Sequence, residues 1–196
     1  MLSNQQTHSS TTGKIMVRLF VAIDIPDNIK TYIQGMARAI PKARSVPPDQ
    51  LHLTLKFIGE VESSLLLDIR DALGRINTPR FSLQLKGVGT FPPRGIPRVL
   101  WVGTKTMENK DHLFDLRKQI DKALFAAGIT KEKKKFSPHI TLARLNNSPI
   151  KALQNFLAGN ALLESPWFEV TSFTLYSSQL TPKGAIHTVE ERYRLR

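Results

Sequence analysis

The sequence contains no cysteine among its 196 residues. This absence excludes a disulfide framework, a thiolate zinc site, an iron–sulfur cluster and a cysteine nucleophile. The chain also lacks an apolar run long enough to span a membrane, and its N-terminus has no charged start followed by an apolar stretch, so neither a membrane span nor export is indicated. We therefore expect a cytoplasmic protein whose chemistry depends on histidine, hydroxyl, carboxylate and basic side chains.

Acidic residues are few compared with basic ones. The chain has 16 Asp and Glu against 28 Lys and Arg, a formal net charge of +12, and the excess is spread through both halves of the sequence. A local basic cluster lies at residues 131–135, where a solvated loop is as good an explanation as a binding site. Because a basic surface attracts phosphate, the composition favours a polyanionic partner such as RNA.

No motif for a bound cofactor is present. Gly87-Val88-Gly89 lacks the third glycine and the following helix of a dinucleotide-binding turn, and the chain has no Gly-Lys-Ser/Thr phosphate loop. Together with the missing cysteine, these observations argue against a nucleotide-cofactor fold and against a thiolate-bound metal.

Residues 1–15 are predicted to be a disordered leader, because residues 3–12 are polar and lack apolar periodicity. Residues 16–196 are predicted to form a single two-lobed domain, and the 41% hydrophobic content is ample for its core. Strands and helices alternate along this part. We expect strands near 17–23, 51–57 (closed by Gly59), 81–88, 98–103, from 139, 167–176 and 186–194, and helices near 26–40, 62–76, 111–127 and 149–158.

The two halves repeat the same order of elements. The first repeat, about 17–90, and the second, about 97–176, both read β-α-β-α-β and align with an offset of about 87 residues. The final strand has no counterpart in the first repeat. We predict an α+β, bilobed fold in which two lobes, related by a pseudo-two-fold axis, have largely antiparallel sheets facing a central cleft. Such a cleft is the natural place for a ligand.

The tetrapeptides HLTL, from residue 52, and HITL, from residue 139, occupy equivalent places in the two repeats. Alternation along a strand puts His52 and Thr54 on one face and the leucines on the other, and it does the same for His139 and Thr141. Two histidines, with an ordinary pKa of about 6.5, can supply a general base and a general acid to a phosphodiester. Threonine hydroxyls can donate to its non-bridging oxygens. The pair of motifs therefore predicts acid–base hydrolysis of a phosphodiester.

The flanks of these motifs resemble one family. The chain is similar to the RNA 2′,3′-cyclic phosphodiesterase family, also named 2′-5′ RNA ligase, of the two-histidine phosphoesterase superfamily. The resemblance is carried by RLFVAIDIP near the start, VPPDQLHLTLKFIGE and FSPHITLAR around the motifs, FPPRGIPRVLWVG between them and TSFTLYSSQL near the C-terminus. It covers about residues 17–194.

The resemblance implies hydrolysis of a terminal 2′,3′-cyclic phosphate on RNA to a 2′-phosphomonoester, without a metal or a nucleotide cofactor. It also implies a reversible 2′-5′ ligation of tRNA-like fragment ends. In this family pattern His139 activates the water, His52 protonates the departing 3′ oxygen, and Thr54 and Thr141 hold the phosphate. Exchanging the two histidine roles predicts the other phosphomonoester. We expect a monomer that acts on RNA and has no membrane partner.

The family pattern extends the second motif to an arginine, which is Arg144 here, and phosphate binding is its implied role. Strict alternation places Arg144 on the apolar face of its strand, so this role requires the strand to end, twist or bulge near Ala143. Phe57 holds the equivalent position in the first repeat. Strict alternation also puts Lys56 on the face of His52, where it is either an added positive charge or a solvated strand lysine.

Other residues carry weaker signals. Phe20, Trp101 and Tyr176 are candidates for stacking on a base, although all three lie in apolar strands, where core packing is the commoner fate. The histidines outside the motifs receive no role; they are His8, His112 and His187.

Two alternatives to an RNA-end hydrolase remain. One is a non-catalytic RNA-binding module, and the other is a phosphodiesterase that acts on a small cyclic nucleotide. The duplicated histidine favours an enzyme, because single-strand binding modules depend on exposed aromatic and basic side chains, and aromatic residues make up only 8% of this chain. The net charge favours RNA over a mononucleotide.

Overall fold

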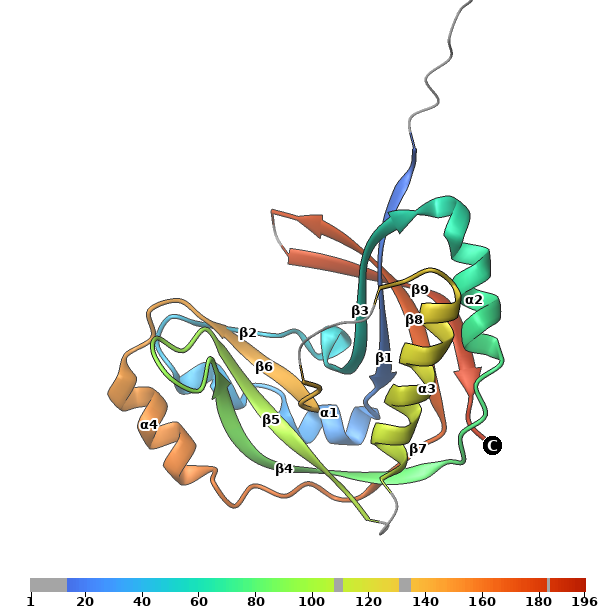
Figure 1. Ribbon diagram of the computed structural model, residues 1–196. Helices are drawn as coiled ribbons and strands as arrows, with labels where there is room; N and C mark the ends of the chain where they lie inside the picture. Colours follow the sequence, from blue (N-terminus) through green and yellow to red (C-terminus); the bar gives the residue numbers. More distant parts are fainter. Residues whose placement is uncertain (1–13, 108–110, 131–134, 183) are drawn as a thin grey trace, which may run out of the picture.

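The computed structural model describes residues 14–107, 111–130, 135–182 and 184–196 (Figure 1). Most of the predicted leader, residues 1–13, and most of the basic cluster, residues 131–134, lie outside the described residues. The strands are β1 (Met16–Asp24), β2 (Ala43–Ser45), β3 (His52–Glu62), β4 (Phe81–Phe91), β5 (Val99–Thr106), β6 (His139–Leu145), β7 (Phe168–Val170), β8 (Ser172–Thr181) and β9 (Gly184–Arg194). The α-helices are α1 (Asp27–Ile33), α2 (Leu66–Gly74), α3 (His112–Ala126) and α4 (Ile150–Gly159).

These strands form one curled sheet in the order β7-β4-β5-β6-β3-β1-β8-β9, with β2 beside β6. Every pairing is antiparallel, so the predicted α+β fold with antiparallel sheets is confirmed. The two motif strands, β3 and β6, are neighbours in the middle of the order. A single residue pair, Leu53 with Ile140, joins them, and this is where the two halves of the sheet meet.

The two repeats exchange their closing strands. β4, which closes the first repeat, pairs with β5 of the second, and β8, which closes the second repeat, pairs with β1 of the first. Helix α3 of the second repeat likewise packs against α2 and β3 of the first. Each half of the sheet is therefore built from both repeats, and this exchange ties the halves together at the motif strands.

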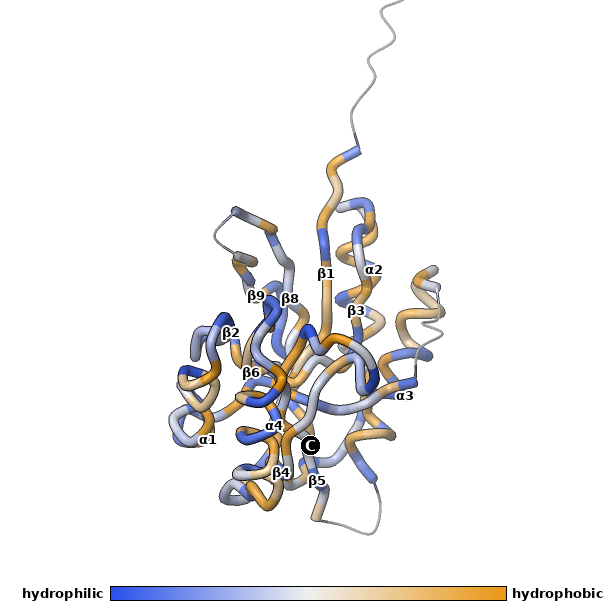
Figure 2. Tube along the Cα trace, turned by 90° about the vertical axis from the view of Figure 1, so that its left-hand side faces the viewer, coloured by the Kyte–Doolittle hydropathy of each residue, from blue (hydrophilic) through white to orange (hydrophobic). Residues whose placement is uncertain are grey.

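The hydrophobic pattern explains where the core lies. β1 is hydrophobic along most of its length (Figure 2) and is buried from Leu19 to Ile23. Helix α3 buries Leu116 and Ile120 on the face that it turns toward the sheet, and Asp111 caps its first turn by accepting a 3.2 Å hydrogen bond from the Phe114 N–H. In the described ranges no helix is both long and apolar enough to cross a membrane.

Several predicted boundaries differ from the structure, and glycine is involved in two of them. The strand predicted over 167–176 is divided into β7 and β8. The first helix ends at Ile33 rather than near residue 40, because Gly35 turns the chain at a φ of 74° and the 3₁₀ turn Met36–Ala39 follows. The prediction that Gly59 closes the second strand was wrong. Gly59 adopts a φ of 89° inside β3, which continues to Glu62 because β1 extends far enough to pair with it.

Matching β-bulges interrupt the alternation in both motif strands. On β3, Leu55 is the extra residue between Thr54 and Lys56. On β6, Leu142 is the extra residue at the same place relative to its motif. After a bulge, the next residue faces the core and the one after it returns to the face of the motif histidine, as the burial of both strands shows.

The bulge on β3 reverses the expectation for Lys56. This side chain is only 2% exposed and faces α3, where its ammonium lies 3.2 Å from Asp121. Arg117 of the same helix contacts Asp121 at 3.2 Å and donates a 2.6 Å hydrogen bond to the carbonyl of Leu55, the bulged residue. The prediction that Lys56 shares the face of His52 was wrong, because it assumed strict alternation through this point.

Replacing Asp121 with alanine removes the carboxylate that Lys56 and Arg117 share. The free energy of unfolding is expected to fall by about 3 kcal/mol, because buried cations then lose their counter-charge. Urea unfolding measures this loss. The matched control is Asp115→Ala, which removes a 3.7 Å pair with the exposed Lys118 on the same helix and is expected to cost less than about 1 kcal/mol. Equal losses in the two variants would contradict the role given to the buried network.

Candidate active site

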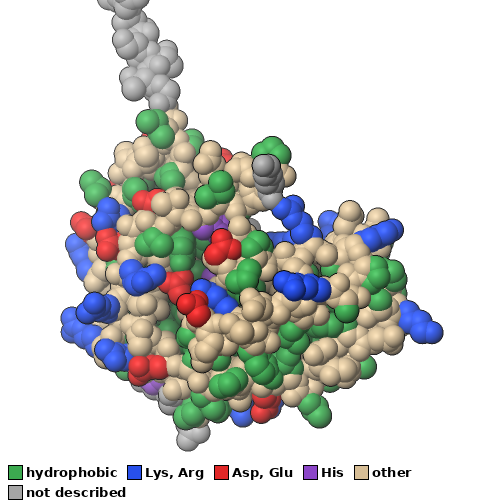
Figure 3. Space-filling model, turned by 180° about the vertical axis from the view of Figure 1, so that it is seen from behind, with side chains coloured by type: hydrophobic (Ala, Val, Ile, Leu, Met, Phe, Trp, Pro, Cys, Tyr) green, Lys and Arg blue, Asp and Glu red, His purple; other side chains and the backbone are tan. Residues whose placement is uncertain are grey.

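Four of the predicted site residues lie together where the halves of the sheet meet. Leu53 and Ile140, the apolar residues between the histidine and the threonine of each motif, pair with each other across β3 and β6 and are fully buried. His52, Thr54, His139 and Thr141 alternate with them and so lie on the opposite face, where all four are half-buried. Extending the antiparallel register by one residue sets His52 beside Thr141 and Thr54 beside His139. In the view from behind, histidine side chains are visible in a hollow near the centre of the molecule (Figure 3).

The two motif histidines are oriented in the same way. Nδ1 of His52 lies 2.8 Å from the carbonyl oxygen of Gln50, and Nδ1 of His139 lies 2.7 Å from that of Ser137. A carbonyl oxygen only accepts hydrogen bonds, so Nδ1 carries the proton and donates it in both rings. Nε2 of each ring is then the atom that can take a proton from a substrate or give one to it.

Burial lowers the pKa of both histidines. For His52 desolvation is the main cause and the positive charge of protonated His187 adds to it; the pKa falls to about 4, although Asp24 acts in the opposite direction. For His139 desolvation again comes first, and the guanidinium of Arg144 also lowers the pKa. Both rings are therefore neutral at pH 7 in the absence of substrate. A bound phosphodiester anion favours the protonated form of either ring.

The bulge at Leu142 places Arg144 on the face of His139. Arg144 is exposed, and its positive charge lowers the pKa of His139. The condition stated for its role, a bulge near Ala143, is thus present in the structure. In the register between β2 and β6, Arg144 pairs with Arg44, which adds a second arginine to this edge of the site.

The matching bulge on β3 places Phe57 on the face of His52. Phe57 there has the position that Arg144 has relative to His139. Phe57 is 59% exposed, and its ring centroid is 6.3 Å from that of Phe20. Phe20 is only 4% exposed and lies 5.0 Å from the His52 ring, stacked on Tyr176 at 5.1 Å. Phe20 is therefore buried against His52 and Tyr176 and has no open face for a base, whereas Phe57 offers an open aromatic surface beside the site. Sequence reasoning did not identify that surface.

Two aromatic rings flank His139 in a similar way. Phe91 of β4 meets the His139 ring edge-on at 4.8 Å, and Trp101 of β5 lies 6.3 Å from it. Each motif histidine thus has aromatic neighbours from the two strands that follow its own in the order of the sheet. These neighbours exclude water from one side of each ring, which accounts for the desolvation that lowers both pKa values.

Asp24 is a site residue that the sequence did not reveal. It ends β1 directly opposite His52 in the register of β1 and β3. Its carboxylate accepts hydrogen bonds from the Thr174 hydroxyl at 2.9 Å, from the Tyr176 phenol, and from Arg192 at 3.2 Å. Asp24 raises the pKa of His52. It therefore places a negative charge on the His52 side of the site, while Arg144 places a positive charge on the His139 side.

His187 was also assigned no role from sequence, yet it lies in the site. It belongs to β9, and its ring meets the His52 ring edge-on at a centroid distance of 5.6 Å. The structure therefore adds a third imidazole to the two expected ones. Within the described residues, no group of three or more His, Asp or Glu side chains is arranged to hold a metal ion.

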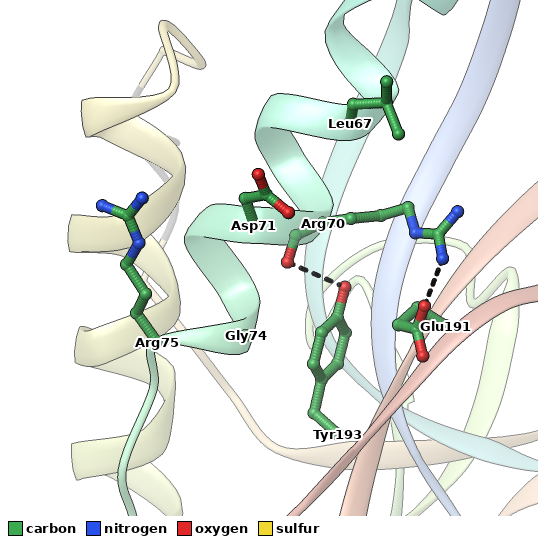
Figure 4. Close-up of a pocket in the computed structure, with 7 residues that line it drawn as sticks. All are labelled: Leu67, Arg70, Asp71, Gly74, Arg75, Glu191 and Tyr193. Atoms are coloured by element: carbon green, nitrogen blue, oxygen red, sulfur yellow. Dashed lines mark hydrogen bonds and ion pairs between the residues drawn. The ribbon is translucent and has the colours of Figure 1, made fainter.

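A separate pocket of about 470 Å³ lies between α2 and β9 (Figure 4). It is lined by Leu67, Arg70, Asp71, Gly74, Arg75, Glu191 and Tyr193. Arg70 is ion-paired with Glu191, and the Tyr193 phenol donates a 3.3 Å hydrogen bond to the Arg70 carbonyl. None of the predicted site residues lines this pocket, so it is distinct from the histidine site.

Known proteins resemble this chain in sequence and in fold. The family described as LigT like Phosphoesterase matches it twice, over residues 23–101 and 105–187. A protein of Thermus thermophilus named RNA 2′,3′-cyclic phosphodiesterase is 37% identical over 189 residues, which cover 92% of this chain and 91% of that protein. The crystal structure of TT0787, also of Thermus thermophilus, aligns with a TM-score of 0.76 and 30% identity over 91% of this chain and 98% of that one. Escherichia coli LigT complexed with 3′-AMP aligns with a TM-score of 0.72 and 28% identity, over 92% and 99%.

Proposed function

Because the chain belongs to the LigT-like phosphoesterase family, we propose that it hydrolyses the 2′,3′-cyclic phosphate at the end of an RNA to a 2′-phosphomonoester. The observation that carries this proposal is the pair of histidine–threonine motifs, which lie on adjacent strands with the same ring orientation in both halves of the sheet. The relative named RNA 2′,3′-cyclic phosphodiesterase supports it. The proposed reaction needs neither a metal nor a cofactor.

The proposed reaction is an attack by water on the phosphorus of the cyclic phosphate. His139 takes the proton of the water at Nε2 as the new phosphorus–oxygen bond forms. The bond between phosphorus and the 3′ oxygen breaks, and His52 gives that oxygen its Nε2 proton. Thr54 and Thr141 donate hydrogen bonds to the non-bridging oxygens, and Arg144 offsets their growing negative charge. The products are a 2′-phosphate and a free 3′ hydroxyl, and one proton has passed from His52 to His139.

The charges around the site support this division of roles. Desolvation lowers the pKa of both histidines, and more strongly that of the more deeply buried His52, so the division of roles depends on the individual charges beside each ring. Arg144 favours the neutral form of His139, which a general base requires. Asp24 favours the protonated form of His52, which a general acid requires. The negative charge of the bound phosphate favours protonation of either ring, and Asp24 adds to this effect at His52.

The pH dependence of kcat/KM tests the acid–base pair. The active free enzyme carries one proton across His52 and His139, so activity falls when both are protonated and when neither is. The pKa of His52 is about 4 and that of His139 is below its ordinary value of 6.5. Loss of the single proton therefore occurs below pH 6.5, and kcat/KM is expected to be highest on the acid side of that value. Initial rates on a short RNA ending in a 2′,3′-cyclic phosphate measure this profile, and a maximum on the alkaline side of 6.5 would contradict the assignment.

RNA is proposed as the substrate rather than a small cyclic nucleotide. The net charge of +12, the arginine pair at positions 44 and 144, and the open aromatic surface of Phe57 all extend the possible contacts beyond one phosphate. We also propose that the 5′ hydroxyl of a second RNA end can replace the attacking water. The same bonds then break, and the product is a 2′-5′ linkage with a free 3′ hydroxyl.

A further inference from the structure

His187 is held in the site by contacts with three strands. Its ring meets Phe20 of β1 at 4.9 Å and His52 of β3 at 5.6 Å, with ring planes at 72° and 88°. It also lies 6.4 Å from Tyr176 of β8, whose pKa is raised by burial and by its hydrogen bond to Asp24, so this neighbour stays neutral. Phe20, Tyr176 and His187 thus all come from strands on the β1 side of β3 in the order of the sheet.

The position of His187 is linked to the backbone that orients His52. Gln50 accepts the Nδ1–H of His52 through its carbonyl oxygen, and its side-chain amide donates a 3.0 Å hydrogen bond to the carbonyl of Ala185. Ala185 precedes His187 by two residues on β9. The His52 ring is thus fixed at Nδ1 by the turn before β3, and it packs against both Phe20 and His187, which belong to other strands and also contact each other.

We propose that His187 is a positioning residue for His52, which holds the His52 ring with Nε2 facing the substrate and, when it is itself protonated, opposes a second positive charge on that ring. This inference rests on the function proposed above, in which His52 is the general acid. It assigns the edge strand β9 a part in the reaction that the two repeated motifs do not provide.

The charges around His187 support the second part of this role. Burial lowers the pKa of His187, and Asp49, in the turn before β3, acts in the opposite direction. At neutral pH His187 is therefore neutral, and Asp24 is left to favour protonation of His52. As the pH falls and His187 becomes protonated, its charge opposes a proton on His52, and so does a protonated His139. The charge of His187 thus shifts the inactive state, in which His52 and His139 are both protonated, to lower pH.

Two substitutions separate the packing role from the charge role. His187→Ala removes the ring against His52 and is expected to lower kcat by about ten- to a hundredfold with little change in KM, because the general acid loses its alignment. His187→Phe keeps an aromatic ring and is expected to restore kcat to within about threefold of the wild type. It is also expected to move the acid limb of the pH profile to higher pH, since His52 no longer faces a second positive charge. His112→Ala, on α3, is the matched control and should change neither quantity.

A titration of the His52 ring by NMR tests the charge role without an activity measurement. In His187→Phe the pKa of His52 is expected to rise above its wild-type value, whether or not a substrate has been found. A wild-type protein that fails to turn over cyclic phosphate ends would overturn the proposed function, while the titration would still report on His187. An active wild type together with an unchanged kcat in His187→Ala, or an unchanged His52 titration in His187→Phe, would overturn the present inference.

Discussion

Replacing His139 with alanine is expected to lower kcat by about a thousandfold, and His52→Ala by a similar factor, because each variant loses a proton transfer in the transition state. Both side chains are half-buried on the face opposite the core. The buried apolar residues that alternate with them, such as Leu53 and Ile140, hold the two strands in place. The fold is therefore expected to survive. Single-turnover rates on an RNA with a 2′,3′-cyclic phosphate end measure the loss, and circular dichroism checks the fold.

A matched histidine control separates this effect from a general cost of substitution. His112 lies at the start of α3, where its ring is 6.3 Å from Phe81, away from the site. His112→Ala is expected to keep kcat within about twofold of the wild type. A folded His52→Ala or His139→Ala variant that turns over as fast as His112→Ala would rule out the two-histidine mechanism.

Arg144→Ala is expected to lower kcat/KM by about a hundredfold, because the phosphate then loses the positive charge that acts on His139. Arg144→Lys is expected to recover only part of this loss, since an ammonium cannot bind two phosphate oxygens in the manner of a guanidinium. The alkaline limb of the pH profile should also move to higher pH in Arg144→Ala, because a cation that lowers the pKa of His139 is gone.

The control for Arg144 is another exposed arginine, outside the site. Arg80 precedes β4 and forms a 3.8 Å ion pair with the exposed Glu169. Arg80→Ala should leave kcat/KM within about twofold of the wild type, and its pH profile unchanged. If Arg144→Ala behaved like Arg80→Ala, the bulge at Leu142 would have no part in phosphate binding.

The repeated motifs could be predicted from the sequence because their information is local. Alternation over four residues is enough to place His52 with Thr54, and His139 with Thr141, on a common face. The order of strands and helices follows from the same local patterns. The match between the two repeats was visible because they share both residue type and spacing.

The bulges could not be predicted from alternation. On β3 the bulged carbonyl of Leu55 is held by Arg117, and the buried Lys56 beside it is neutralised by Asp121, both from a helix more than fifty residues later in the chain. The strand itself carries no sign of these partners. The placement of Lys56 was therefore wrong, while the bulge that Arg144 required is present on β6 at Leu142.

The other neighbours of His52 depend on pairings between distant strands. Asp24 reaches it through the register of β1 with β3, and His187 reaches it through β9, which has no counterpart in the first repeat. The exchange of closing strands between the repeats decides which aromatic residues flank each histidine. Sequence periodicity identifies strands but does not say which strands become neighbours, so these residues became visible only in the structure.

The most direct test of the central claim is the identity of the product. The purified protein, with EDTA present, is incubated with a short RNA that ends in a 2′,3′-cyclic phosphate, and the 2′- and 3′-phosphate products are resolved chromatographically. We predict complete conversion to the 2′-phosphate, with the same rate with and without EDTA. A 3′-phosphate product would contradict the assignment of His52 as the acid and His139 as the base, and an absence of turnover would contradict the proposed reaction itself.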